Sequence, residues 1–470
     1  MKNLAQRRGP WPLPTAALLG GALMLPLAAC NLDDILRVED PEFATPETLD
    51  NAAGLPVIVA GAIGDFQIGY TGAGGDGFLS VQALLGDEFY QTDTFETRRR
   101  TDQRRQFLTG TPNTSDIPFN RLQYGRRSLK DAADAVARLA SATDPRIAEL
   151  KALGGYTYIA LADGWCSAIP FSATLTGGRL GDFGAPANTQ QVYDSAVARF
   201  NEALAVSASN HLAAVGKGRA LLAKGQYQAA AAAVANVPDD FVYFVRHSTN
   251  SVRQNNPIFA LQDNGRYGVS DDEGGPILTT RRGGGGDDGN GLKFRSGDPR
   301  ILVSDSVPGF EPAIPSYRNL LYPNLDADIP ISSGLEARLI QAEAALQSGN
   351  TTQWLQILNS LRGNATTLMR ARYPTYTATA TLAPLTDPGT AQGRIDLMFS
   401  ERAFWLYNTG TRLGDLRRLV REYKRPQDQV YPTGPFHRGG TYGNDVAFPV
   451  PFDEVNNPQF TPSQCNVEQA

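Results

Sequence analysis

Aromatic side chains in loops and one dense group of arginines are the residues whose types and positions point to ligand binding. Flat rings can stack on the apolar faces of sugars. Between residues 98 and 130 the chain has nine basic and two acidic side chains, and guanidinium groups there could hold carboxylates or sulfates, or simply form a solvated helical face. The candidate ligand-binding residues are Tyr90, Phe95, Arg98, Tyr267, Phe294 and Tyr317.

Motifs for catalysis, nucleotides and metals are weak. Gly72–Gly77 has GxGxxG spacing, but a dinucleotide site also needs alternating strands and helices, so a turn is favoured. Residues 324–335 lack the glycine and the bidentate acid of a calcium loop. The three histidines, His211, His247 and His437, lie in no nucleophile motif. The sequence predicts no enzyme, metal or cofactor, although abundant acids leave a carboxylate-pair hydrolase open.

The N-terminal residues have the pattern of a lipoprotein export signal. Basic residues precede an apolar run over residues 16–25, which is too short to cross a bilayer as a helix. The sequence Leu-Ala-Ala-Cys then ends at Cys30 and resembles the bacterial lipobox. We expect residues 1–29 to be a removed signal peptide and Cys30 to be lipidated, so that acyl chains tether residues 30–470 to a membrane. The alternative is a plain secretory peptide with an incidental cysteine.

Composition and charge narrow the function classes further. The chain has 470 residues, of which 41% are hydrophobic and 19% charged, as is typical of globular proteins. Its net charge of −5 argues against nucleic acid as a partner. Apart from Cys30, the cysteines are Cys166 and Cys465, which could form one disulfide in an oxidising compartment.

Apolar residues in the body of the chain repeat with helical spacing. A stripe over residues 193–204 predicts a helix. Two more helices are predicted at 211–225 and 227–238, where Gly225 and Pro238 end them. This pair looks like a tetratricopeptide hairpin, and recurring hairpins imply stacked helices with a shared core. The same pattern recurs over residues 334–350 and 354–362 and over residues 119–140 and 145–163.

The predicted fold is mainly α: a tetratricopeptide-like stack of helical hairpins with a large loop-rich insertion. The helical repeats extend over about 45–238 and 331–420. The insertion at about 239–330 is so rich in glycine, aspartate and proline that no regular helix is expected there. A C-terminal closing segment covers about 421–470. Tryptophans after the signal peptide lie in or beside helical stripes and are expected in the core.

Taken in order along the chain, these features resemble the SusD/RagB family of outer-membrane nutrient-binding lipoproteins. The C-terminal run contains Glu-Arg, then Gly-x-Arg-x-x-Asp-Leu-x-Arg, as the family does. Within this run Glu401, Arg412 and Asp415 are better interpreted as a structural charge network than as catalysts. The segments that carry the resemblance are Gly155–Trp165 with residues 168–171, Leu335–Ala344, Leu358–Arg362, Glu401–Arg418 and Asp445–Pro458.

The resemblance implies a non-catalytic lipoprotein of the outer membrane, at the cell surface, that captures a nutrient and acts as the lid of a SusC-like TonB-dependent transporter. In starch-binding members loop aromatics form the site, and residues 86–98 and 239–330 correspond to those loops. The resemblance makes an oligosaccharide the first expectation. Neither segment contains tryptophan, which departs from the starch-binding members, so a peptide or an acidic polymer stays open. The alternatives are a lipid-anchored tetratricopeptide scaffold for envelope proteins and an envelope hydrolase.

Overall fold

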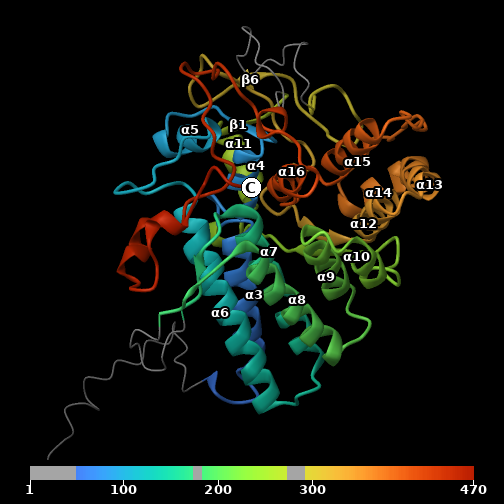
Figure 1. Cartoon of the computed structure of the whole chain (residues 1–470). Helices are drawn as coiled ribbons and strands as arrows, with labels where there is room; N and C mark the ends of the chain where they lie inside the picture. The colour runs from blue at the N-terminus through green and yellow to red at the C-terminus, as the bar shows by residue number, and fades with distance from the viewer. Residues whose placement is uncertain (1–48, 173–182, 272–291) are drawn as a thin grey trace, which may run out of the picture. The chain divides into compact units, whose positions relative to one another are not determined.

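Paired helices and a loop-rich half with short strands make up the unit Glu47–Ala470 (Figure 1). The structure, a computed structural model, describes residues 49–172, 183–271 and 292–470. The predicted signal peptide, residues 1–29, and Cys30 lie outside these residues. Within the described ranges no helix is both long enough and apolar enough to cross a membrane.

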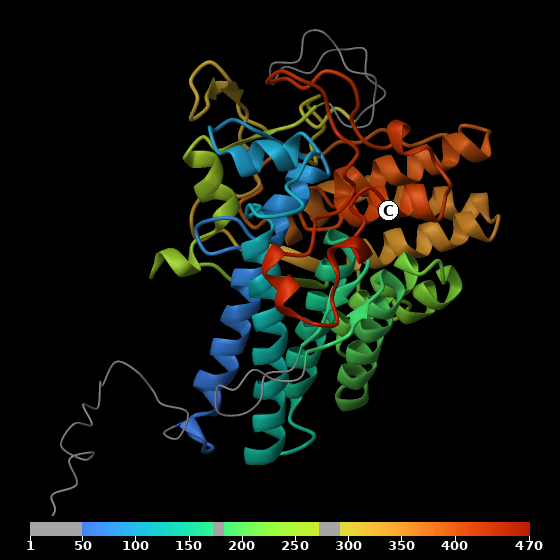
Figure 2. The same ribbon diagram turned by 60° about the vertical axis from the view of Figure 1, so that its left-hand side comes forward.

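Helices that follow one another in sequence pack side by side in the helical half, and Figures 1 and 2 show them as one continuous row. The row consists of α3 (Leu55–Tyr70), α6 (Asp116–Leu139), α7 (Pro145–Gly164), α8 (Thr189–Val206), α9 (His211–Ala223), α10 (Tyr227–Ala233), α12 (Gly334–Gln347) and α13 (Thr351–Gly363). These helices confirm the predicted helical hairpins. The pair α9–α10 precedes the insertion, and the pair α12–α13 follows it. The helix predicted at 227–238 is shorter, since α10 ends at Ala233.

The other elements are short and lie mainly in the loop-rich half. The helices are α4 (Phe78–Leu85), α5 (Glu96–Asp102), α11 (Pro257–Asp263), α14 (Ala365–Arg372), α15 (Ala391–Trp405) and α16 (Arg412–Arg421), with 3-10 turns η1 (Val252–Gln254), η2 (Gln427–Gln429), η3 (Phe452–Asn456) and η4 (Pro462–Gln464). The strands are β1 (Phe89–Gln91), β2 (Ile169–Pro170), β3 (Pro186–Ala187), β4 (Val242–Val245), β5 (Tyr267–Val269), β6 (Val307–Pro308), β7 (Pro315–Ser316) and β8 (Ile329–Ser333).

Side-chain caps and small residues explain why the hairpins form where they do. The side chain of Asn188 caps α8 by accepting the backbone N–H of Gln191, and the side-chain oxygen of Gln191 accepts the backbone N–H of Asn188. Where α9 crosses α8, a Cβ on Gly216 would lie 2.3 Å from the ring of Phe200. Only glycine therefore allows this close contact, and the edge of Tyr156 packs on the same ring.

The insertion departs from its prediction in one respect, because α11 is a regular helix within it. Asn256 caps α11 by accepting the N–H of Phe259, and Pro257 stands at the first helical turn, where a missing N–H costs nothing. Ile258 and Leu261 are buried and hold the helix against the core. The expectation of no regular helix in 239–330 was therefore wrong, because a local cap and an apolar stripe outweigh the surrounding composition.

Two short sheets fasten the insertion to the rest of the fold. Its ends meet in the antiparallel pair β4–β8, with Val242 opposite Ser333. Its middle meets the N-terminal part of the chain in the antiparallel pair β1–β5, with Phe89 opposite Val269. The loops between these strands are thus fixed at both ends.

The C-terminal segment closes over the helical half through a covalent bond and buried polar contacts. Cys166 and Cys465 form a disulfide that joins residues 299 positions apart. The guanidinium of Arg104 donates to the backbone carbonyl of Asp445 at 2.8 Å. Trp165, beside this seam, is fully buried, as Trp354 is, and Trp405 is nearly so, which confirms their predicted place in the core.

Candidate functional site

Two exposed phenylalanines with an arginine between them form the most conspicuous aromatic surface in the loop-rich half. Phe95 is 52% exposed and Phe310 is 51% exposed. The guanidinium of Arg266 lies 3.8 Å from the centre of the Phe310 ring and 5.3 Å from that of Phe95. Both are cation–π distances, so the three side chains form one ordered unit. We call Phe95, Arg266 and Phe310 the exposed stack.

Three segments that are remote in sequence bring the exposed stack together. Phe95 precedes α5, Arg266 precedes β5, and Phe310 lies between β6 and β7. Thr92 N–H donates to the carbonyl of Arg266 at 2.9 Å, and Phe310 N–H donates to the carbonyl of Gly265 at 2.8 Å. Gly265 has φ of +63°, and a Cβ there would lie 2.6 Å from the Phe310 nitrogen, so glycine is required for this approach. The backbone therefore fixes where both phenylalanines stand.

Arg98 supports the stack from beneath. Its Nη2 donates to Asp76 at 2.7 Å and its Nη1 to Asp93 at 2.6 Å. Its guanidinium lies 4.9 Å from the centre of the Phe95 ring and 5.3 Å from that of Tyr267. Burial alone would lower the pKa of Arg98, but the neighbouring Tyr267, Asp76 and Asp93 raise it above its ordinary value. Arg98 is thus a neutralised support for Phe95, not a free cation.

The glycine-rich motif supplies one of these carboxylates. Gly72–Gly77 follows the helix α3 and not a strand, which excludes the dinucleotide interpretation and leaves the turn that was favoured. Gly72 and Gly74 both have positive φ, and the turn aims Asp76 at Arg98 and at the hydroxyl of Tyr267, which donates at 2.6 Å. The motif therefore builds the floor of the candidate site.

Three of the predicted ligand-binding rings are packed inside the protein. Tyr267 is fully buried and stacks on Phe89, with 6.0 Å between ring centres. Phe294 is fully buried against Tyr407, at 5.0 Å. Tyr90 is 5% exposed, and its hydroxyl donates to a backbone carbonyl at 2.5 Å. These rings have little or no face open to a ligand, because the strands β1 and β5 that carry two of them are wholly buried.

The exposure of Tyr317 is intermediate between that of the exposed stack and that of the three buried rings. It is partly buried, and the guanidinium of Arg295 lies 4.1 Å from its ring centre. Its carbonyl accepts the N–H of Val269 at 2.8 Å, which ties it to β5. Tyr317 thus repeats, in a more sheltered position, the aromatic–arginine pairing of the exposed stack.

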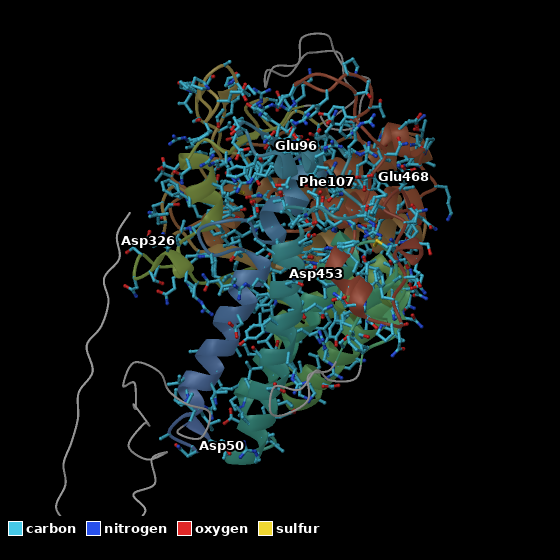
Figure 3. All side chains as sticks on the ribbon, turned by 90° about the vertical axis from the view of Figure 1, so that its left-hand side faces the viewer. Asp50, Glu96, Phe107, Asp326, Asp453 and Glu468 are labelled. Carbon is cyan, nitrogen blue, oxygen red and sulfur yellow. A yellow bond between two sulfur atoms is a disulfide. The ribbon has the colours of Figure 1, made fainter. Side chains whose placement is uncertain are left out.

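Of the residues around the exposed stack, the sequence predicted Phe95 and Arg98 as candidates but neither Arg266 nor Phe310. The sequence did contain a signal for Phe310. This ring directly follows Pro308 and Gly309, a pair typical of turns, and a ring in a turn is hard to bury. Figure 3 shows Glu96, the neighbour of Phe95, in the loop-rich half, well away from Asp50 at the start of α3.

Most other arginines of the basic run have protein partners. Arg99 and Arg100 pair with Glu96 at 2.5 and 2.9 Å. Arg104 is buried under the C-terminal segment, and Arg127 pairs with Asp131 at 2.7 Å. These contacts favour a structural and solvated role for the run over an anion site. In the residues that the structure describes, no group of three or more His, Cys, Asp or Glu side chains is placed to hold a metal ion.

The comparisons with known proteins give matches among solved structures. No protein-family model matches the sequence. No curated protein matches it either. A SusD-like carbohydrate binding protein from Bacteroides vulgatus is 16% identical, with 82% of this chain and 86% of that chain covered and a TM-score of 0.55.

Two further solved structures are similar over most of their length. A SusD homolog from Bacteroides thetaiotaomicron is 15% identical, with 89% of this chain and 98% of that chain covered and a TM-score of 0.58. A laminarin binding SusD-like protein is 15% identical, with 87% and 98% covered and a TM-score of 0.54. At such identities the likeness is one of fold.

Proposed function

We propose that this chain, whose fold is that of the SusD-like proteins, is a non-catalytic lipoprotein of the cell surface that captures an oligosaccharide. In this proposal Cys30 carries the lipid, and the chain serves as the lid of a SusC-like TonB-dependent transporter in the outer membrane. The exposed stack is the place of capture. Phe95 and Phe310 are its contact residues, Tyr317 extends it, and Arg98 positions Phe95.

The single observation that carries the proposal is the exposure of two ordered phenylalanine rings. A single exposed ring needs no explanation, but two exposed rings held together around one arginine form a contiguous patch, and such patches are typical of contact surfaces. Sugar rings present apolar C–H faces that stack on flat side chains, while their hydroxyls accept hydrogen bonds from guanidinium groups. Arg266 is placed between the two rings to supply such donors.

The descriptions of two solved structures with this fold support sugar binding at such a surface. Solved structures with this fold include one described as carbohydrate binding and one described as laminarin binding. Because those proteins share only about a seventh of their residues with this chain, the sugar itself is left to experiment.

Affinity electrophoresis in gels containing laminarin, amylopectin, xylan or polygalacturonate tests the proposal. We expect the mature protein to be retarded by at least one of these glycans. Phe95→Ala and Phe310→Ala should abolish the retardation, because each removes a stacking face at little cost to a half-exposed position. Phe452→Ala is the matched control, since Phe452 is a 43% exposed ring in η3 outside the exposed stack. Retardation unchanged in both stack variants would refute this site.

The anchor and the partner need their own measurements. Radiolabelled palmitate should enter the wild-type protein in a Gram-negative host and should not enter Cys30→Ser. Mild detergent extraction followed by affinity purification should bring down a plugged outer-membrane barrel in stoichiometric amount. An unlabelled wild-type protein would remove the lipoprotein part, and a barrel-free purification would remove the transporter part, while the glycan result would stand by itself.

A further inference from the structure

Three arginines beside the exposed stack converge on one buried aspartate. Asp93 is fully buried, and its Oδ2 lies 2.6 Å from the guanidinium of Arg98 and 3.7 Å from that of Arg266. Its backbone carbonyl accepts a hydrogen bond from Arg438 of the C-terminal segment. Its Oδ1 accepts the N–H of Phe95 at 3.1 Å, which places this junction next to one ring of the stack. The charges of the three guanidinium groups therefore belong to the surroundings of the candidate sugar site.

Each of these guanidinium groups has a carboxylate near it, and three carboxylates serve the three cations. The pairs are Arg98 with Asp76, Arg266 with Asp93, and Arg438 with Glu311. The positive and negative charges of these six groups cancel. A charged ligand that docks on the stack loses part of its hydration, and this loss is offset only where an uncompensated opposite charge awaits it. The six groups supply no such charge to an anion.

The other arginines of α5 do not change this balance at the stack. Arg98 faces Phe95, and at about 100° per residue Arg100 lies on the opposite side of the helix. Both Arg99 and Arg100 pair with Glu96 on the same helix, at 2.5 and 2.9 Å. Exposed pairs of this kind are screened by salt and act weakly at a distance.

Glu311 is the acid that a ligand on the stack would meet first. It follows Phe310 directly in the chain, and its side chain is 38% exposed, whereas that of its partner Arg438 is 13% exposed. The N–H of Glu311 donates to the carbonyl of Thr92 at 3.0 Å, so its backbone is fixed. A carboxylate in this position accepts hydrogen bonds from hydroxyl groups and repels another carboxylate.

The same matching of charges occurs at Tyr317, the extension of the stack. Arg295, which stacks on this ring, has its Nε 3.6 Å from a carboxylate oxygen of Asp271. Asp271 also accepts the backbone N–H of Arg295 at 2.6 Å. Both parts of the candidate site thus combine aromatic faces with arginines whose charge is compensated.

We propose that the exposed stack selects electrically neutral oligosaccharides over those with carboxylate or sulfate groups, and that Glu311 determines this selectivity. The inference rests on the proposed sugar-binding function and narrows its ligand class. A neutral sugar stacks on Phe95 and Phe310 without losing the hydration of a charge, and its hydroxyls can accept from Arg266. An acidic sugar loses that hydration, meets the carboxylate of Glu311 and finds Arg438 already paired.

Isothermal titration with pairs of glycans that differ mainly in charge tests this proposal on the mature protein. The pairs are laminarin and carboxymethyl-laminarin, amylopectin and carboxymethyl-amylopectin, linear xylan and glucuronoxylan, and carboxyl-reduced polygalacturonate and polygalacturonate. We expect the neutral member of at least one pair to bind, at least about tenfold more tightly than its acidic partner. Raising NaCl from about 50 to about 500 mM should change the affinity for the neutral member less than about twofold, because no ionic contact with the ligand is screened.

Glu311→Gln is the decisive variant, since it removes the exposed carboxylate and releases the charge of Arg438. Its affinity for the acidic member should rise at least about tenfold above that of wild type, a gain that misfolding cannot produce. The matched control is Glu202→Gln on α8, because Glu202 is 33% exposed and pairs with Lys151 at 2.8 Å in the helical half. It should leave the affinity for both members as in wild type. Adding Arg438→Gln to Glu311→Gln should cancel the gain, because the released cation is then absent.

Two results would overturn this inference and leave sugar capture standing. Wild type could bind the acidic member as tightly as the neutral one, with both lost in Phe310→Ala, or Glu311→Gln could gain no affinity for the acidic member. A gain that persists in the double variant would overturn it as well, because Arg438 would not be the cation that Glu311 masks. Binding to no member of any pair, together with no retardation in the glycan gels, would refute sugar capture and this inference with it.

Discussion

Asp415 is the centre of a buried charge network that joins three helices of the C-terminal half. Its carboxylate accepts from Arg402 at 2.8 and 3.0 Å and from Arg418 at 2.8 Å. Arg418 also donates to Glu343 on α12 at 2.5 Å, so α12, α15 and α16 are linked. Burial alone would raise the pKa of Asp415, but the charges and hydrogen bonds of Arg402 and Arg418 lower it from 3.8 to about 2.

We predict that Asp415→Asn destabilises the fold strongly at neutral pH. The substitution leaves two buried guanidinium groups with one carboxylate fewer, and breaking a buried ion pair from one side costs about 3–5 kcal/mol. The pKa supplies a second figure. A carboxyl whose pKa is about 2 in the fold and 3.8 in the unfolded chain contributes roughly 2 kcal/mol.

The pH dependence has a definite sign. Because the folded pKa of Asp415 is depressed, its contribution is complete above about pH 4 and is lost as the pH falls through about 2. Wild type should therefore lose more stability than Asp415→Asn between pH 5 and pH 2. The gap between the two proteins should narrow over that window.

Urea unfolding followed by tryptophan fluorescence at pH 7, 5, 3 and 2 measures both effects. Asp134→Asn is a control, since Asp134 forms an exposed pair with Lys130 and should leave the transition almost unchanged. A cost below about 1 kcal/mol for Asp415→Asn at pH 7, or a gap that stays constant to pH 2, would show that this network does not stabilise the fold as the geometry indicates.

Three further changes have expected outcomes of their own. Replacing Cys166 and Cys465 by alanine should lower the free energy of unfolding by on the order of 4 kcal/mol, measured in urea, because the lost cross-link closes a very long loop. Glu336→Gln should cost about 3–5 kcal/mol, seen as a lower thermal midpoint, since it breaks the buried bidentate pair with Arg219, whose donors lie at 2.6 and 2.7 Å. Burial raises the pKa of Glu88 from 4.5 to about 7, so its ionisation opposes folding above pH 7 and this cost disappears toward pH 4.5. Glu88→Gln should therefore flatten wild-type stability between pH 5 and 8 by up to about 3 kcal/mol, and an unchanged slope in urea titrations would contradict this.

The helical half could be predicted because its signals are local. Stripes such as residues 193–204 repeat every three to four positions, and caps such as Asn188 lie directly before them. Both operate within a few residues, so a single sequence contains all the information they need. The structural role expected for Glu401 and Asp415 is also met, since Glu401 accepts from Arg300 at 2.9 Å and from Arg362 at 2.6 Å.

The candidate site could be predicted only in part because its contacts are long-range. Whether a loop aromatic faces water depends on strand pairing across the chain, and the pairing of β1 with β5 joins segments nearly 180 residues apart. That pairing buries Tyr90 and Tyr267 and leaves Phe95 exposed. The ion pair of Arg98 could not be predicted from local sequence either. Its partner Asp76 lies in the turn before α4, whereas Arg98 follows α4 in the chain.

The buried polar contacts explain how exposed rings are kept in place on a loop-rich half. The insertion is fixed by β4–β8, by β1–β5 and by the ion pair from Arg300 to Glu401 on α15. Each of these contacts restricts the loop that carries Phe310 before any ligand arrives. Because a ligand then need not order the loop, more of its stacking energy is available for affinity. Substitutions at Glu401 should accordingly weaken glycan retardation without touching the exposed stack, which a site on freely moving loops would not show.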